Sequence, residues 1–292
     1  MKISVVTVCY NMAAYIEQTI RSVLDQKYDG LEYIIIDGGS TDGTVDIIRK
    51  YSDQLAYFVS EPDKGMYDAL RKGLGHATGE VVAWLNADDV YFPWTFDMVG
   101  RVFSAYPDVS WVGGRHAYLS PDGMLSQVCS KCSAKSKRDI SNGWCRSDVI
   151  GPLQQESMFW RRSLYEASGG IDPSYRYAGD FDLWRRFADH AELVKIDVPL
   201  AAFRRRKDSL SSSGSVSYDD EISKSAAHCP SFPNLFWRVC GHNRALNQAL
   251  RVLRFRRIEL VYFPNDGSEP RKKRILTNCS NHTFGALKTY GK

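Results

Sequence analysis

Several features that would assign a protein class directly are missing from this chain of 292 residues. No apolar run approaches the roughly 20 residues that span a bilayer, and the apolar start is too short for a signal peptide before it reaches Asn11. The cysteine count, seven, is odd, and only Cys129 and Cys132 form a C-x-x-C pair. We therefore expect reduced thiols and a cytoplasmic location, rather than a zinc site or a disulfide framework.

The common nucleotide-binding loops are also missing. The sequence has no G-x-x-x-x-G-K-[ST] motif, which argues against a P-loop ATPase. Gly73, Gly75 and Gly79 follow an expected helix instead of a strand, so they do not form the G-x-G-x-x-G turn of a dinucleotide-binding fold. A nucleotidyltransferase would need a phosphate-gripping Gly/Lys loop after the first strand, and Tyr10-Asn11-Met12 is not one.

Charge is spread unevenly along the chain, whose net charge is +4. Residues 1–223 carry 25 Lys and Arg against 31 Asp and Glu, a net −6, while residues 224–292 carry 13 against 3, a net +10. A basic segment of this kind can meet a polyanion or an anionic surface. Because no nucleic-acid recognition motif accompanies the charge, we expect no nucleic-acid partner.

The sequence does contain apolar, β-branched stretches that alternate with segments of helical periodicity. Strands are expected at residues 3–9, 33–36, 56–60 and 81–86, with helices between them around 16–24, 45–51 and 66–74. This order predicts an α/β fold with a mostly parallel central sheet flanked by helices. The later elements expected are helices at 94–106 and 181–189, strands at 109–113, 116–119, 157–160, 193–198 and 200–203, and a loop at 126–150.

The stretch VVAWLNADD at residues 81–89 carries the functional argument. A strand buried on both faces ends here in Asn86, Ala87, Asp88 and Asp89, and open α/β sheets bind their ligands at the carboxyl ends of strands. A hard divalent cation is bound by one or two carboxylates plus substrate phosphates, so this turn could hold a metal ion against a nucleotide diphosphate. An alternative is that these acids cap the next helix.

A second candidate site follows the strand at 33–36. Asp37 precedes the stretch GGSTDGT at residues 38–44, whose glycines allow a tight turn with the backbone close to a ligand. Exposed N–H groups at the start of the next helix could face a phosphate, although an ordinary strand-to-helix turn would have the same residues.

Six stretches in order make the sequence similar to family 2 of the inverting glycosyltransferases, which have the GT-A fold, in the group that builds bacterial polysaccharides such as O-antigen and colanic acid. The matching stretches are VVTVCYN at 5–11, IDGGSTDGT at 36–44, SEPDKGMYDALRKGL at 60–74, ATGEVVAWLNADD at 77–89, QQESMFWRRSLYEASGGID at 154–172 and AGDFDLWRRFA at 178–188. They cover about residues 1–210.

This resemblance implies that Asp37 and Asp63 contact the base and ribose of a nucleotide sugar, and that Asp88 is the metal-binding member of a D-x-D motif, with Asn86 in place of the first acid. The cofactor expected is Mg²⁺ or Mn²⁺. The donor-binding residues expected are Thr7, Tyr10, Asn11, Asp37, Ser40, Asp63, Lys64, Gly65, Asp68, Asn86, Ala87, Asp88, Arg204 and Arg206. The acceptor-binding residues expected are Gln155 and Glu156.

Asp180 matches the catalytic aspartate of the family's E-D motif, with Gly179 in place of the glutamate. A base for a sugar hydroxyl must be ionised, and we expect the N-terminal dipole of the following helix and a metal ion to keep Asp180 ionised. A plain helix cap is the alternative role. Glu156 is the next candidate for the base, and Asp182 should be structural because it points elsewhere on the helix.

Two basic segments follow the expected last strand. The four cations at 204–207 precede a Ser/Gly run, which suits a lid over a diphosphate, or a solvated loop. Further on, Leu246, Ala249, Leu250 and Leu253 have helical spacing among Arg244, Arg251, Arg254, Arg256 and Arg257. Such a basic amphipathic helix could lie on an anionic leaflet or pack on the acidic body. The stretch from Arg271 to Arg274 onward is expected to be mobile.

The sequence thus predicts a catalytic domain at 1–215, with a nucleotide-sugar half at 1–115 and an acceptor half at 116–215, and a basic, partly helical extension at 216–292. The function expected from the resemblance is a hexosyltransferase that moves a sugar from a nucleotide-diphosphate donor to a hydroxyl of a lipid-linked saccharide, with inversion, in the cytoplasm or at the inner face of the membrane. A catalytically weak sugar-nucleotide or membrane-surface binding module is the alternative.

Overall fold

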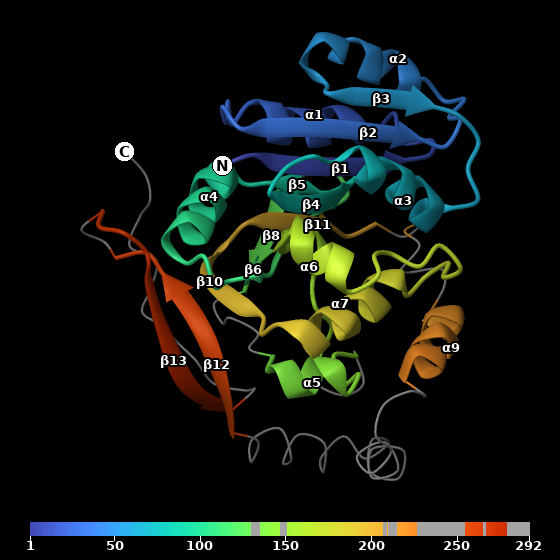
Figure 1. Ribbon diagram of the computed structural model, residues 1–292. Coiled ribbons are helices and arrows are strands. Elements are labelled where there is room, and N and C mark those ends of the chain that lie inside the picture. Colours follow the sequence, from blue (N-terminus) through green and yellow to red (C-terminus); the bar gives the residue numbers. More distant parts are fainter. Residues whose placement is uncertain are drawn as a thin grey trace.

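The computed structural model describes residues 1–129, 135–146, 151–206, 209, 215–226, 255–264 and 267–278. Their core is a nine-stranded sheet with the strand order β13-β12-β10-β6-β9-β4-β1-β2-β3 (Figure 1). A smaller sheet with the order β5-β11-β7-β8 lies beside it. The α/β fold with a mostly parallel central sheet is therefore confirmed.

The first half of the chain alternates strands and helices as expected. Its elements are β1 (Ile3–Cys9), α1 (Ile16–Leu24), β2 (Leu31–Asp37), α2 (Thr44–Arg49), β3 (Tyr57–Ser60), α3 (Met66–His76) and β4 (Val81–Asn86). β1 pairs in parallel with both β2 and β4, and β2 with β3, so the ends of all four strands meet at one edge of the sheet. This edge carries most of the predicted site residues.

The second half contains shorter elements. They are β5 (Val90–Tyr91), α4 (Thr95–Ala105), β6 (Trp111–Arg115), β7 (Ala117–Leu119), β8 (Leu125–Val128), α5 (Lys137–Ser141), the 3₁₀ turn η2 (Gln155–Ser157), β9 (Met158–Arg161), α6 (Arg162–Ala167), α7 (Gly179–His190), β10 (Val194–Pro199) and β11 (Ala201–Arg204). β9 runs antiparallel to both of its neighbours, β4 and β6. The described part of the expected loop at 126–150 includes the end of β8 and a short helix, α5, which begins with a Ser136 capping box.

Alternating side chains of the strands fill two cores, one on each face of the sheet. Along β1, Val6 and Val8 join the core beneath α3 and α7, while Ile3 and Val5 join the core beneath α1 and α4. Aromatic contacts hold α7 against the sheet. The ring centroid of Trp184 lies 5.9 Å from that of Trp111 and 5.4 Å from that of Trp160. Aromatic contacts of this kind add to the burial of the rings, and they fix the helix that begins at the predicted base.

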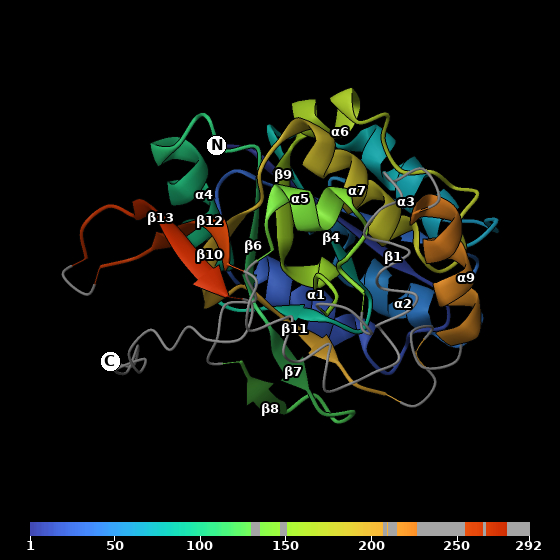
Figure 2. The ribbon, with the colours of Figure 1, turned by 90° about the horizontal axis from the view of Figure 1, so that it is seen from below.

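The end of the chain differs from the expectation of a mobile basic stretch. β12 (Phe255–Tyr262) and β13 (Arg271–Asn278) form an antiparallel hairpin, and β12 pairs in parallel with β10, so both strands extend the central sheet. The prediction of mobility from Arg271 to Arg274 is therefore wrong. Lys272 contacts Asp108, with 2.6 Å between Nζ and Oδ2, which ties the hairpin to the body. The hairpin lies on the opposite side of the molecule from α9 (Ser215–Ala226) in both views (Figure 2).

The amphipathic helix expected around Leu246–Leu253 lies outside the described residues and stays a prediction. Arg256 and Arg257, which the sequence places in that helix, instead belong to strand β12, where they pair with Thr277 and Leu276 of β13. Among the helices that the structure describes, none is both long and apolar enough to cross a bilayer.

Candidate active site

The strand ends at the carboxyl edge of the sheet bring together side chains from four segments. In the register of the sheet Cys9 lies opposite Asp37, Val8 opposite Asn86, and Asp37 opposite Ser60. The turns after β1, β2, β3 and β4 are therefore neighbours, as the parallel pairing requires.

Asp37 is completely buried at this edge and stabilises the turn that follows it. Its carboxylate accepts hydrogen bonds from the hydroxyl groups of Ser40 and Ser60 and from the backbone N–H of Gly39 and Ser40. Burial opposes ionisation, but the hydrogen bonds from Ser40 and Ser60 outweigh it and lower the pKa of Asp37. A nucleoside could reach this carboxylate only if one of these bonds were released.

The turn after β1 is locked to the turn after β2. Asn11, at a φ of 52°, accepts a hydrogen bond from Thr41 N through Oδ1 at 2.9 Å, and its own N–H donates to Ser40 Oγ at 2.7 Å. The N–H groups of residues 39–41 therefore have protein acceptors, as in an ordinary strand-to-helix turn. Tyr10 projects from this turn with 60% of its surface exposed, while Thr7 is buried and shares a 3.0 Å hydrogen bond with Tyr33.

Asp63 reaches the same edge from the turn after β3. A Cβ atom on Gly38 would lie 2.6 Å from Asp63 Oδ2, so the carboxylate lies directly over this glycine. Gly65, at a φ of 120°, donates its N–H to Asp63 Oδ1 at 2.7 Å. The N–H of Lys64, whose side chain is exposed, donates to the buried Asp68 carboxylate at 3.2 Å, which fixes the start of α3.

The acidic turn after β4 does not cap a helix. The next helix, α4, begins only at Thr95, with Trp94 as its N-cap. Instead the Thr19 hydroxyl lies within hydrogen-bond distance of the carbonyl groups of Ala87 and Asp89, at 2.9 and 2.8 Å, and holds the turn against α1. The alternative of a capping role for Asp88 and Asp89 is therefore excluded.

Arg204 is the buried centre of contacts around this turn. Its backbone N–H donates to Asp89 Oδ1 at 2.8 Å, and its Nε donates to the Asp88 carbonyl at 2.7 Å. The other guanidinium nitrogens donate to the Pro121 carbonyl and to Gln18 Oε1, and the group lies 5.1 Å from the ring of Tyr15. These contacts give Arg204 a structural role, because they hold the acidic turn after β4 in place.

Arg206 is placed differently. Its Nε lies 2.7 Å from Asp88 Oδ2, and its guanidinium lies 5.3 Å from the ring of Tyr15. A charge-assisted contact of this kind places a cation on the carboxylate that the sequence assigns to the metal. Arg206 therefore lies where it could meet either this carboxylate or a phosphate group.

Asn86, Gln155 and Glu156 line the inner wall of the site. Asn86 Oδ1 accepts from Trp84 Nε1 at 2.7 Å, and its Nδ2 donates to Gln155 Oε1 at 3.2 Å. Burial is the main cause that raises the pKa of Glu156 to about 8, and the negative charges of Asp88 and Asp180 add to the rise. Burial also raises the pKa of the Asp89 carboxyl, and the charges of Asp88 and Glu156 add to this rise. The surroundings of both groups thus favour the neutral form of the carboxyl over the ionised form.

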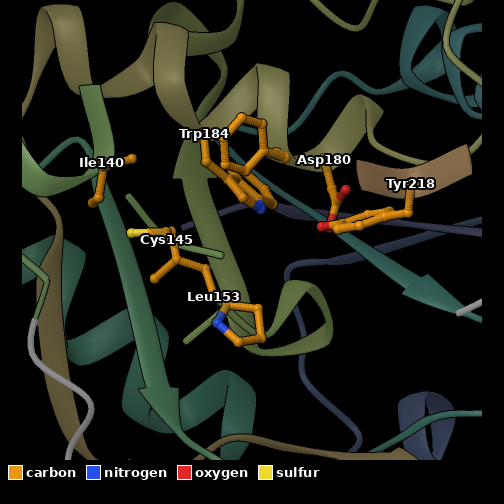
Figure 3. A pocket seen from close by; sticks show the side chains of 8 residues that line it. Ile140, Cys145, Leu153, Asp180, Trp184 and Tyr218 are labelled. Carbon is orange, nitrogen blue, oxygen red and sulfur yellow. The ribbon is translucent and has the colours of Figure 1, made fainter. Parts of the chain in front are cut away.

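Asp180 lies in the first turn of α7, at the wall of a pocket formed with α5 and α9 (Figure 3). The pocket residues are Ile140, Cys145, Pro152, Leu153, Asp180, Phe181, Trp184 and Tyr218. Burial raises the pKa of Asp180 to about 6, although backbone N–H groups of the helix start oppose the rise. Burial thus outweighs the helix N-terminus, so that the pKa of Asp180 is raised, whereas the sequence led us to expect that the dipole and a metal ion favour the ionised form.

Tyr67 of α3, which the sequence analysis did not single out, touches the base. Its hydroxyl lies 3.4 Å from Asp180 Oδ1 and accepts from the Asp180 backbone N–H at 3.3 Å. A Cβ atom on Gly179 would lie 2.8 Å from this ring, so the glycine is needed for the ring to lie there. Asp182, as expected, is structural: its carboxylate contacts Arg186 at 2.8 Å and Ser225 at 2.9 Å.

The side chains around Asp88 could supply only some of the ligands that a divalent metal ion needs. Within the described ranges, no group of three or more His, Cys, Asp or Glu side chains could hold a metal ion by itself. Asp88 offers one carboxylate at the edge of the sheet, already matched with a cation, Arg206. Mg²⁺ and similar ions are bound by one or two carboxylates together with substrate phosphates. Asp88 fits such a site when a diphosphate supplies the remaining ligands.

Comparison with known proteins decides the family. The glycosyl transferase family 2 model matches residues 4–142. An uncharacterized glycosyltransferase of Mycobacterium tuberculosis is 40% identical over 205 residues, which are 69% of this chain and 74% of that protein. The chain belongs to glycosyl transferase family 2. An uncharacterized glycosyltransferase of Nostoc is 33% identical over 201 residues, 65% of this chain and 57% of the relative.

Solved structures share the fold. TarS of S. aureus in complex with UDP-GlcNAc has a TM-score of 0.59 at 17% identity, over 78% of this chain and 67% of that one. The mannosyltransferase PcManGT of Pyrobaculum calidifontis in complex with GDP-Man and Mn²⁺ has a TM-score of 0.57 at 22% identity, over 86% and 74%. The GT-A fold is thereby confirmed. The chain spans 57% and 64% of the length of the Nostoc and Rickettsia typhi relatives.

Glu156→Gln is expected to flatten the pH dependence of the free energy of unfolding between pH 5 and pH 8. The pKa of Glu156 rises from 4.5 to about 8 on folding, so the unfolded chain releases a proton in this window that the folded protein keeps. The wild-type protein therefore loses stability as pH rises, by up to about 1.4 kcal/mol per pH unit from this group.

Urea unfolding at several pH values measures this slope. Glu166→Gln, at an exposed position on α6, is the matched control and should leave the slope unchanged. Equal slopes for wild type and Glu156→Gln would contradict the assignment of a buried, protonated Glu156.

Proposed function

We propose that this family 2 glycosyltransferase moves a sugar from a nucleotide-diphosphate donor to a hydroxyl group of a saccharide acceptor, with inversion, in the assembly of a cell-surface polysaccharide. The observation that carries the proposal is a pair of carboxylates with different surroundings, Asp88 after β4 and Asp180 in the first turn of α7, whose charges both act on Glu156. Asp88 is matched with a cation at the donor side, and Asp180 lies partly exposed at the wall of a pocket. Asp88 can therefore meet the diphosphate of the donor, and Asp180 can meet the hydroxyl group of the acceptor.

Asp180 acts as the base in this proposal. Its pKa of about 6 leaves it ionised at pH 7 and still basic enough to accept a proton, whereas Glu156, with a pKa of about 8, would already hold one. The Asp180 carboxylate takes the proton of the acceptor hydroxyl while the oxygen attacks the anomeric carbon. The bond from that carbon to the diphosphate breaks on the opposite face, which inverts the configuration.

Asp88 and Arg206 serve the leaving group. A divalent ion bound at Asp88 would neutralise negative charge on the diphosphate. Arg206 would give up the Asp88 carboxylate and donate to the phosphate oxygens, since a guanidinium binds phosphate as readily as carboxylate. Tyr10, the exposed ring beside Gly38 and Asp63, is the surface on which the nucleoside would lie. The named relatives support the donor class: TarS was crystallised with UDP-GlcNAc and PcManGT with GDP-Man.

The acceptor proposed is a saccharide of the cell-surface polysaccharide class. A relative of Bacillus subtilis named as a putative teichuronic acid biosynthesis glycosyltransferase is 42% identical over 90 residues, which supports an acceptor of the cell-surface polysaccharide class. We take a lipid-linked saccharide as the acceptor and Gln155 and Glu156 as residues near it. A sugar-nucleotide binding module without turnover is the alternative, and donor hydrolysis or transfer by the purified protein separates the two.

Asp180→Asn is expected to keep the fold and donor binding but to lower turnover by about 10²–10⁴-fold, because the amide cannot take a proton. Turnover of a panel of nucleotide sugars, followed as release of the nucleoside diphosphate, measures the effect. Asp189→Asn, an exposed position at the far end of α7, is the control. Turnover of Asp180→Asn within a few-fold of wild type would sink the assignment of the base.

Asp88→Ala is expected to abolish the gain in nucleoside diphosphate affinity that Mn²⁺ gives the wild-type protein. Calorimetric titrations with UDP and GDP, each with Mn²⁺ and with a chelator, measure this gain. Asp53→Ala, a substitution at an exposed position outside the predicted site, should behave as wild type. If the wild-type protein binds equally well in the chelator and in Mn²⁺, the metal has no place at Asp88.

We further propose peripheral binding to the inner face of the membrane, supported by the net +10 of residues 224–292. The expected result is co-sedimentation with anionic vesicles that weakens at high salt, since each basic residue near such a surface contributes about 1 kcal/mol. Arg251→Glu with Arg254→Glu should remove the binding. Equal recovery with neutral and anionic vesicles would contradict the proposal.

A further inference from the structure

Helix α9, which begins where the catalytic domain expected from the sequence ends, packs against the start of α7. Ile222 of α9 forms a small buried cluster with Ala178 and Phe181, the residues that flank the first turn of α7. Tyr218 of the same helix lines the pocket beside Asp180 (Figure 3). The base therefore has α9 on one side of it.

Glu221 makes the strongest contact between α9 and the turn that precedes the base. Its carboxylate accepts three hydrogen bonds from consecutive backbone N–H groups: Arg176 N to Oε1 at 2.9 Å, and Tyr177 N and Ala178 N to Oε2 at 2.8 Å each. Hydrogen bonds to an ionised acceptor are about twice as strong as neutral ones. The turn at 176–178 has no regular secondary structure to hold these N–H groups in place, so the carboxylate sets its shape.

The same turn is held from the opposite side by α3. The Tyr67 hydroxyl lies 3.0 Å from the carbonyl oxygen of Tyr177, and the ring lies against Gly179. A second contact keeps α9 on α7, because Ser225 Oγ donates to Asp182 Oδ1 at 2.9 Å and Arg185 Nε donates to Ser225 Oγ at 3.2 Å. The segment from residue 176 to Asp180 is thus clamped between α3 and α9.

We propose that Glu221 is a positioning residue for the base, and that α9 belongs to the catalytic unit although it lies beyond residue 215. This inference rests on the proposed role of Asp180. Glu221 touches no reacting atom; it fixes the turn from which Asp180 projects, and so fixes the distance between the carboxylate and the acceptor hydroxyl. Misplacement of a catalytic group by about 1 Å can cost 10²-fold in rate.

Glu221 also acts on Asp180 through its charge. The charged and titratable groups that face Asp180 are Tyr67 of α3, Glu156 of η2, and Tyr218 and Glu221 of α9. Burial raises the pKa of Asp180 most, and the negative charge of Glu221 adds to the rise. Loss of that charge should lower the pKa of the base, so that turnover is retained to lower pH.

Three variants of the full chain test the proposal: Glu221→Ala, Glu221→Gln and Asp220→Ala. Asp220 is an exposed acid on the same helix, so its removal changes the charge and helix composition in a matched way. We expect Glu221→Ala to lower kcat about 10–10²-fold with the KM for the donor unchanged, and Glu221→Gln, which keeps an accepting oxygen, to recover part of the rate. In both Glu221 variants the acid limb of the kcat profile should move to lower pH, and in Asp220→Ala it should not.

Hydrogen exchange provides a readout that does not depend on turnover. Amide hydrogens of the segment 176–178 should exchange faster in Glu221→Ala than in wild type, and at the wild-type rate in Asp220→Ala. If Glu221→Ala fails to fold, Glu221→Gln decides the outcome with the same two measurements.

The outcomes separate this inference from the proposed function. If Asp180→Asn is inactive while both Glu221 variants keep wild-type kcat, pH profile and exchange, the positioning role is overturned and the base is not. If Asp180→Asn stays active, the base assignment falls and the role of Glu221 falls with it. A loss of rate in Glu221→Ala that is accompanied by an equal loss in Asp220→Ala would show general damage to α9 and would also overturn the proposal.

Discussion

The buried guanidinium of Arg204 is the contact on which the arrangement of the donor side depends. It joins three segments that are far apart in sequence: the acidic turn after β4, Gln18 of α1, and the turn at Pro121. A buried cation is costly unless its donors find acceptors, and here carbonyl and amide oxygens accept from each of the three guanidinium nitrogens. The carboxylate of Asp88 is consequently left for Arg206 or for a ligand.

Carboxyl groups crowd the interior of this site, and their mutual repulsion is relieved by protons as well as by cations. Burial and neighbouring charges raise the pKa of Asp89 and Glu156, whereas hydrogen bonds keep that of Asp37 low. Asp180 lies between these extremes, because part of its surface is exposed and helix N–H groups oppose its desolvation. The same fold thus provides carboxyl groups with different proton affinities a short distance apart, which acid–base chemistry requires.

Much of this could be predicted from the sequence, because the parallel strands follow from their apolar, β-branched runs and the strand ends then meet at one edge. Asp88 was predicted from the end of such a strand, whereas Asp180 was predicted from its match to the family's E-D motif. The clamp by Glu221 could not be predicted: one acid in a polar helix gives no periodic signal, and its partners are backbone groups 43–45 residues away. The hairpin β12–β13 was missed because basic residues at Arg271–Arg274 resemble a solvated tail until the edge of β10 is known.

The close approach of Tyr67 to Gly179 links two positions that are 112 residues apart in the chain. The aromatic ring fills the volume that a side chain at position 179 would need, and its hydroxyl supplies a contact to the following aspartate. A chain that has a larger residue at position 179 must then have a smaller or displaced one at position 67. Where a chain has the motif's glutamate at position 179, the ring at position 67 must therefore lie elsewhere, and the contact of its hydroxyl with the base must change with it.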